Sequence, residues 1–166
     1  MMDTWNSRPD ALKNLLNPAF MSIVIASISK GYFEESNYRI DLPLLQLAVS
    51  LILNKSISKK LPKQKTTSMP GWINSNISLL IGFREKSGDM LTYLKEGMVW
   101  GCNHNILSIN DESQICLLPD ANPQFFKSIQ RNRGLCEYHR TSVRMGRWFA
   151  VSGLPKTVLQ IWEMLL

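Results

Sequence analysis

The sequence has few cysteines and no long apolar run. Its three cysteines, Cys102, Cys116 and Cys136, are too few and too odd in number for the disulfide framework of a small secreted domain. The longest apolar stretch, from Leu42 to Leu53, is far short of the roughly 20 residues that span a bilayer. The first residues lack the basic flank and apolar run of a secretion signal. We therefore expect a soluble, cytoplasmic protein that makes no membrane contact.

Charged residues are also few, and basic residues outnumber acidic ones. Charged residues make up 19% of the 166 residues, which is low for a free-standing surface and suggests that partners cover part of it. The net charge of +6 permits contact with nucleic acid or with an acidic protein. The length fits one domain, residues 1–166, with a hydrophobic core of its own.

Patterns that carry catalysis or hold a cofactor are missing. The glycines in the middle of the chain are isolated, so they form no phosphate-binding loop. Two pairs, Cys102 with His104 and Cys136 with His139, supply the residue types of a zinc site without its knuckle spacing. Neither histidine has a carboxylate nearby in sequence to orient it as a base. We expect no enzymatic activity, no metal and no cofactor; an enzyme that uses Cys136 and His139 is the third alternative.

The sequence contains several signals that predict where helices begin. Asn17 before Pro18 and Asn122 before Pro123 each place a capping residue directly before a proline. The apolar residues after Pro18 predict a buried helix that frays near Gly31, with residues 34–37 as a turn. Residues 42–53 predict a central helix, although two buried strands would also fit their apolarity. Further helices are expected from residue 87, after residue 122 and at the C-terminus.

Two segments between these helices have a different character. Residues 55–70 carry lysines among Ser, Thr and Pro and predict a basic connector loop, which could be solvated or could contact phosphate. Residues 106–118 contain two short apolar runs joined by a polar loop and predict a β-hairpin. The predicted fold is a mainly α single domain with one small β-hairpin. A winged helix-turn-helix also has helices followed by a hairpin. A winged-helix-like arrangement is therefore compatible with the predicted order of elements.

Arginines dominate one predicted helix near the C-terminus. At 3.6 residues per turn, Arg140, Arg144 and Arg147 form one stripe, which Arg133 joins if the helix runs through Gly134. Guanidinium groups bind carboxylates and phosphates bidentately. The stripe is therefore a candidate contact with an acidic protein or with a nucleic-acid backbone. An ordinary solvated helix face is the alternative.

The helix predicted before the hairpin does not look like a DNA-reading helix. A recognition helix presents Arg, Asn or Gln to base edges. This helix instead offers Asp89, Thr92, Lys95 and Glu96, whose charges nearly balance. Sequence-specific reading of the major groove is therefore not expected.

The chain ends on an apolar segment. Residues 159–166 include Leu159, Ile161, Trp162 and Met164. Such an end either folds back on the body of the protein or docks in a partner's groove as an amphipathic helix.

Short motifs along nearly the whole chain, in a shared order, resemble the middle component of bacterial ABC three-component (ABC-3C) systems. They are Trp5, Asn6, Arg8 and Pro9; residues 15–20; the leucine-rich residues after Asp41, Leu42 and Pro43; Leu61 and Pro62; Trp72; Phe83 and Arg84; residues 146–150; and residues 152–155 with Thr157.

The resemblance implies a non-catalytic subunit that bridges a DNA-sensing, SMC-like ABC ATPase and a separate effector, often a nuclease. Such systems include the Lamassu type of defence against phages and plasmids. The resemblance extends an interaction role to Arg147 and Trp148, although Trp148 and Phe149 could equally be core residues. The alternative function is a stand-alone DNA-binding winged-helix regulator. The candidate contacts to a partner or to a DNA backbone are Arg133, Arg140, Arg144, Arg147, Trp148, Lys59, Lys60 and Lys63.

Overall fold

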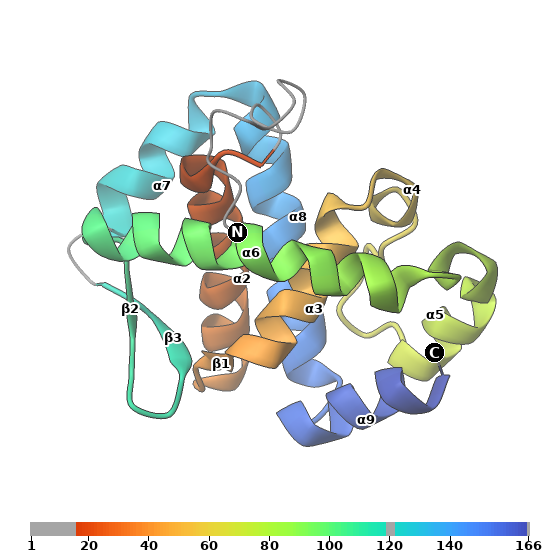
Figure 1. Ribbon diagram of the computed structural model, residues 1–166. Helices are drawn as coiled ribbons and strands as arrows, with labels where there is room; N and C mark the ends of the chain where they lie inside the picture. The colour runs from red at the N-terminus through yellow and green to blue at the C-terminus, as the bar shows by residue number, and fades with distance from the viewer. Residues whose placement is uncertain (1–15, 119–121, 166) are drawn as a thin grey trace.

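Two long helices packed side by side form the centre of the protein. The computed structural model describes residues 16–118 and 122–165. Helices α2 (Pro18–Ser36) and α8 (Arg133–Val151) lie against each other over most of their lengths (Figure 1). The side chain of Asn17 caps α2 by accepting a hydrogen bond from the N–H of Ala19, as its position before Pro18 predicts.

Two glycines allow the backbones of α2 and α8 to touch. A Cβ atom on Gly31 would lie 2.0 Å from the carbonyl oxygen of Val143, and one on Gly146 would lie 2.2 Å from that of Ile28. The prediction that α2 frays near Gly31, with a turn over residues 34–37, is therefore wrong. Packing against α8 keeps the helix intact to Ser36, after which Asn37 adopts the left-handed conformation.

Gly134 marks the beginning of α8 and does not kink it. The side chain of Asn132 accepts hydrogen bonds from the N–H groups of Gly134 and Leu135, which caps the first turn. Arg133 is therefore in the first turn of the same helix as Arg140, Arg144 and Arg147. Helix α7 (Asn122–Gln130) lies just before it and packs on its N-terminal half.

Helix α6 (Phe83–Asn103) crosses in front of α2 and α3 (Leu42–Leu53), as Figure 1 shows. It begins four residues before the predicted start at Ser87, because Gly82 adopts a positive φ of 72° and lets the chain turn into the helix. Residues 42–53 form one helix, as predicted, and most of their side chains are buried.

The basic segment is more ordered than a connector loop. Residues 55–70 contain helix α4 (Lys55–Ser58) and the first turn of α5 (Met69–Ser75), which leads into the 3₁₀ helix η2 (Ile77–Leu80). The prediction of a loop over the whole segment is therefore corrected at both ends. The two ends are helical because side chains cap them: Asn54 accepts hydrogen bonds from two N–H groups of α4, and Ser68 caps α5.

The predicted hairpin is present and belongs to a three-stranded sheet. Strands β2 (Leu107–Ile109) and β3 (Gln114–Leu117) pair antiparallel, with Ser108 opposite Cys116. The short strand β1 (Ile40–Asp41) adds to the other edge of β3, which gives the order β1-β3-β2. The mainly α fold with one small β-hairpin is confirmed, and the third strand is an addition to it.

The apolar C-terminal helix α9 (Pro155–Leu165) folds back on the body of the protein near α3 and α5 (Figure 1). Val158 is fully buried, and Trp162 packs among Trp72, Phe83 and Met69. Of the two alternatives for this end of the chain, the structure shows the first. In the described part of the chain, no helix combines the length and the apolarity needed to cross a bilayer.

Candidate interaction surface

Basic residues are concentrated on two segments that the fold brings together. Residues 55–70 carry five lysines and no acidic residue, whereas residues 122–151 carry six basic residues and one acidic residue, Glu137. The first segment contains α4, and the second contains α7 and α8. A groove between α4 and α8 joins them, as described below. We call the exposed part of these two segments the basic surface.

The arginine stripe on α8 divides into paired and unpaired members. Nη2 of Arg147 lies 2.8 Å from Oε2 of Glu34 on α2, and Lys30 pairs with the other oxygen of the same carboxylate. Burial by itself would raise the pKa of Glu34, but hydrogen bonds and charges from Lys30 and Arg147 outweigh burial and hold that pKa below its usual value. Arg147 therefore has an internal partner, which sequence reasoning did not anticipate.

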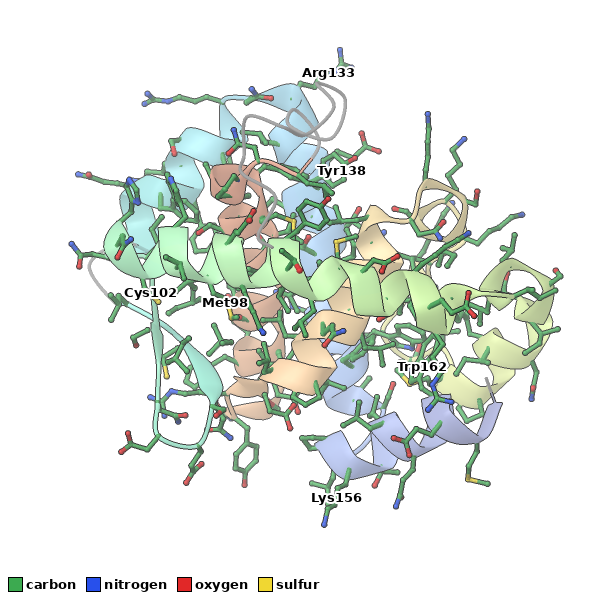
Figure 2. The ribbon with its side chains drawn as sticks, in the orientation of Figure 1. Met98, Cys102, Arg133, Tyr138, Lys156 and Trp162 are labelled. Carbon is green, nitrogen blue, oxygen red and sulfur yellow. The ribbon has the colours of Figure 1, made fainter. Side chains whose placement is uncertain are left out.

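The other arginines of the stripe differ in their exposure. Arg133 and Arg140 are exposed, and Arg144 is half-buried. Arg133 projects from the end of the molecule opposite to Lys156 of α9 (Figure 2). Because Arg144 follows Thr141 by three residues and precedes Trp148 by four, all three lie along one line of α8.

Trp148 is a core residue, and this corrects its assignment as a surface contact. Its side chain is 1% exposed and packs edge-on against Trp72 and Phe149. Its indole nitrogen donates a hydrogen bond to the carbonyl oxygen of Thr67, 2.8 Å away. A partner therefore has no direct access to it; Trp148 instead fixes the end of the basic segment against α8.

Lys59, Lys60 and Lys63 are all exposed, as expected for contact residues. The segment that carries them is held at several points. Ile57 of α4 is fully buried. The indole nitrogen of Trp72 donates a hydrogen bond to the carbonyl oxygen of Lys60, 2.8 Å away. Lys65 forms an ion pair with Glu35 of α2 at 2.6 Å. The lysines thus project from a positioned backbone.

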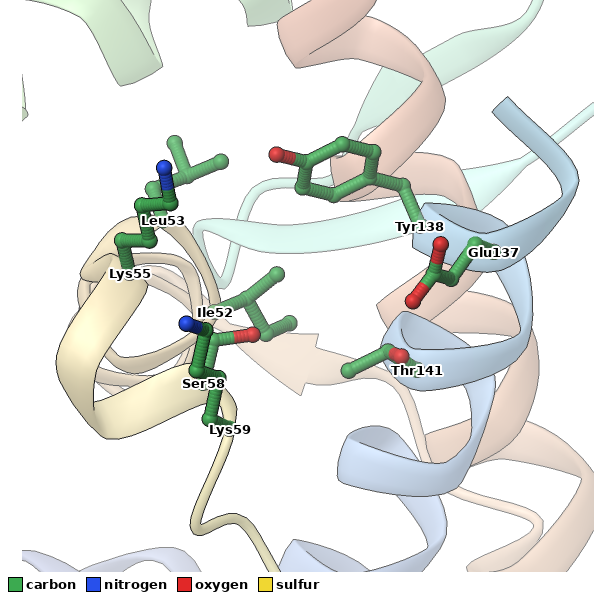
Figure 3. A pocket seen from close by; sticks show the side chains of 8 residues that line it. All are labelled: Ile52, Leu53, Lys55, Ser58, Lys59, Glu137, Tyr138 and Thr141. Atoms are coloured by element: carbon green, nitrogen blue, oxygen red, sulfur yellow. The ribbon is translucent and has the colours of Figure 1, made fainter. Parts of the chain in front are cut away.

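Figure 3 shows a groove between α4 and α8. Its volume is about 280 Å³, and two apolar side chains of α3, Ile52 and Leu53, are among its lining. Lys55 and Lys59 stand on one wall, with Glu137, Tyr138 and Thr141 on the other. Pockets for whole small molecules usually occupy about 300–1,000 Å³, so this groove is of a size for one or two side chains. The lining residues are Ile52, Leu53, Lys55, Ser58, Lys59, Glu137, Tyr138 and Thr141.

Sequence reasoning missed this groove for an identifiable reason. Tyr138 packs edge-on against Phe20 with ring centroids 4.9 Å apart, and it also borders the groove. Glu137 and Thr141 are about 80 residues away from α4 in sequence, so no local pattern relates them to Lys55. The four-residue spacing of Lys55 and Lys59 was the available signal, since it places both on one face of a helical turn.

One histidine of the two Cys–His pairs, His139, is held by a hydrogen bond to α2. The hydroxyl of Ser27 donates to the carbonyl oxygen of Ile23, so it accepts a hydrogen bond from Nδ1 of His139, 2.8 Å away. Burial lowers the pKa of His139, and the nearby charges of Lys30 and Arg140 lower it further against the opposing effect of Glu34. Burial likewise raises the pKa of the Cys102 thiol. In residues 16–118 and 122–165, no three His, Cys, Asp or Glu side chains gather where they could hold a metal ion.

Comparison with known proteins identifies the family. No curated protein and no solved structure matches the chain. The family model of ABC-three component (ABC-3C) system Middle Component 3 matches residues 5–164, which is nearly the whole sequence. The protein therefore belongs to the Middle Component 3 family of ABC-three component systems.

Proposed function

We propose that this protein is a non-catalytic, cytoplasmic subunit that bridges an SMC-like ABC ATPase and an effector in a Lamassu-type defence complex against phages and plasmids. The effector we expect is a nuclease. The observation that carries the proposal is the family match over residues 5–164, because the family is named as the middle component of a three-component system.

The basic surface supports an assembly role. Lys59, Lys60, Lys63, Arg133 and Arg140 are exposed on segments whose backbones are fixed by helix caps and buried anchors. Fixed segments lose little conformational freedom when a partner binds, which favours association. A sequence-independent contact with DNA backbone at the same surface is a further part of the proposal.

The alternative of a stand-alone winged-helix regulator has less support. Helix α6, which precedes the hairpin, buries Leu94, Gly97 and Met98 against the body of the protein. Its exposed side chains include both Asp89 and Lys95, which give no basic surface toward a major groove.

Co-expression tests the proposal. The full chain is tagged and purified together with the ATPase and the effector encoded next to it. We expect a complex of three components, and we expect Arg133→Glu/Arg140→Glu, at two exposed positions of α8, to disrupt it while the chain still folds by circular dichroism. A matched control is Lys86→Glu/Lys156→Glu, which makes the same change in charge on exposed positions of α6 and α9.

The outcomes are distinct. Assembly with the control but not with the α8 variant supports the bridging role and its location. Failure of the wild-type chain to co-purify with either neighbour contradicts the proposal. Tight binding of the lone chain to one DNA site, about a thousandfold over random DNA, would instead establish the regulator.

A further inference from the structure

We propose that the groove between α4 and α8 binds an acidic segment of a partner protein, one that inserts an apolar side chain between flanking carboxylates. The inference deepens the proposed function, on which it rests for the existence of a partner. It names the place of contact and the chemistry of the segment that fits it.

Charge complementarity gives the first argument. The two walls come from segments with eleven basic residues and one acidic residue. Two of the eleven, Lys65 and Arg147, are paired with Glu35 and Glu34 of α2. Lys55 and Lys59 stand at the groove itself and are exposed. A segment with several carboxylates would be attracted to this surface and would be oriented along it.

The apolar lining of the groove gives the second argument, because it separates a protein segment from a nucleic acid. Ile52 and Leu53 of α3 line it on the same side as Lys55 and Lys59, and the ring of Tyr138 borders it from α8 (Figure 3). A duplex DNA backbone presents phosphates and sugar rings and has no projecting apolar side chain to insert between these residues, whereas a peptide can insert a leucine or a phenylalanine. Glu137 on the second wall can accept a hydrogen bond from a backbone N–H group of a bound segment.

The rigidity of the walls gives the third argument. Asn54 caps α4, and fully buried Ile57 anchors it to the core. On the far side of the same segment, the indole of Trp148 holds Thr67. The second wall, α8, is packed along α2. Both walls are thus in place before a ligand arrives, which lowers the entropic cost of binding.

A defined set of probes tests the inference without the partner complex. The purified full chain is titrated by fluorescence anisotropy with a labelled eight-residue peptide of Asp and Glu that has a central leucine. The comparison probes are the same peptide with serine for leucine, its Lys counterpart, and a 20-base-pair duplex of random sequence.

We expect the acidic leucine peptide to bind tightest, and the serine peptide to bind about tenfold more weakly, because the buried leucine supplies much of the affinity. Lys55→Glu/Lys59→Glu should weaken binding by about tenfold or more. Thr141→Trp, which fills the groove from the opposite wall, should do the same without changing charge. The control Lys86→Glu/Lys156→Glu makes the same charge change on exposed positions of α6 and α9, outside the basic surface, and should leave most of the affinity intact.

Four results would overturn the inference: no peptide binding up to about millimolar concentration, equal binding of the leucine and serine peptides, tighter binding of the DNA duplex, or an equal loss in the control variant. Co-purification with the ATPase and the effector is a separate measurement. Its failure together with tight, leucine-dependent peptide binding would reject the proposed function and keep the groove. Successful co-purification without leucine-dependent peptide binding would support the proposed function and reject the groove as the binding site.

Discussion

The indole nitrogen of Trp148 donates a hydrogen bond to the carbonyl oxygen of Thr67, 2.8 Å away and 81 positions earlier in the chain. This one contact joins the helix that carries the arginines to the segment that carries the lysines. Trp148 also packs edge-on against Trp72, whose own indole nitrogen holds the carbonyl oxygen of Lys60. The two tryptophans therefore fix both ends of the segment from residue 60 to residue 67.

Removal of the indole hydrogen bond should loosen this segment. Trp148→Phe keeps a buried aromatic ring but leaves the Thr67 carbonyl without its donor, so the free energy of unfolding should fall by about 1–3 kcal/mol. Trypsin should cleave after Lys60 and Lys63 faster than in the wild type. Urea denaturation and timed proteolysis measure the two effects. Trp100→Phe is the matched control, because Trp100 is half-buried and its indole nitrogen makes no hydrogen bond with the described residues 16–118 and 122–165. Equal effects in both variants would contradict a role of the Trp148–Thr67 hydrogen bond in holding the segment.

The glycines between α2 and α8 should tolerate no side chain. Gly146→Ala would place a Cβ atom 2.2 Å from the carbonyl oxygen of Ile28, so the helices must separate. We expect a loss of at least about 3 kcal/mol in the free energy of unfolding or a failure to fold, by analogy with severe overpacking of a core. Gly88→Ala is the control, because it lies in α6 with nothing within 4 Å of the added atom. It should stabilise the protein by about 0.5–1 kcal/mol, and a mild effect of Gly146→Ala would refute the close packing.

The pairing of Glu34 should make part of the stability sensitive to acid. Because Lys30 and Arg147 hold the pKa of Glu34 below its ordinary value, folding is favoured by its ionised form. This contribution is fully present above about pH 4.5, and it is lost as the pH falls through the lower pKa of the folded state. Since the pair is over a third exposed, we expect Glu34→Gln to cost under about 1 kcal/mol at pH 7.

Urea titrations from pH 7 to pH 3 measure this effect. The free energies of unfolding of wild type and Glu34→Gln should approach each other as the pH falls, because Glu34 becomes protonated and loses its charge. Glu112→Gln, in the exposed hairpin turn, controls for the loss of one negative charge. A difference in the free energy of unfolding between wild type and Glu34→Gln that stays constant at every pH would show that the ion pairs are not its cause.

His139 should give a second, separate pH dependence. Burial and the charges of Lys30 and Arg140 lower its pKa, so the unfolded chain binds a proton more readily than the folded chain. The free energy of unfolding should therefore decrease as the pH falls below about 6.5, until the lower pKa of the folded state is reached. His139→Asn keeps a donor for Ser27 but cannot titrate, and it should flatten this slope. An unchanged slope between pH 6.5 and 5 would exclude His139 as its source.

Features that depend on neighbours in sequence were predictable. Asn17 before Pro18 marks the start of α2 because the capping side chain and the fixed φ of proline act within one turn. The hairpin over residues 106–118 follows from two apolar runs around a polar turn. The spacing of Arg140, Arg144 and Arg147 on one helix is likewise a local property.

What each of these residues does was decided by tertiary structure. Arg147 has the same sequence character as Arg140, yet Glu34, 113 positions earlier, pairs with it. Trp148 follows directly, and packing of α8 against α2 and the basic segment turns it into the core. The groove exists because α4 and α8 meet across α3, which joins Lys55 and Lys59 to Glu137 and Thr141. Burial and pairing depend on which surfaces meet in space, and a linear pattern specifies the surfaces without specifying their partners.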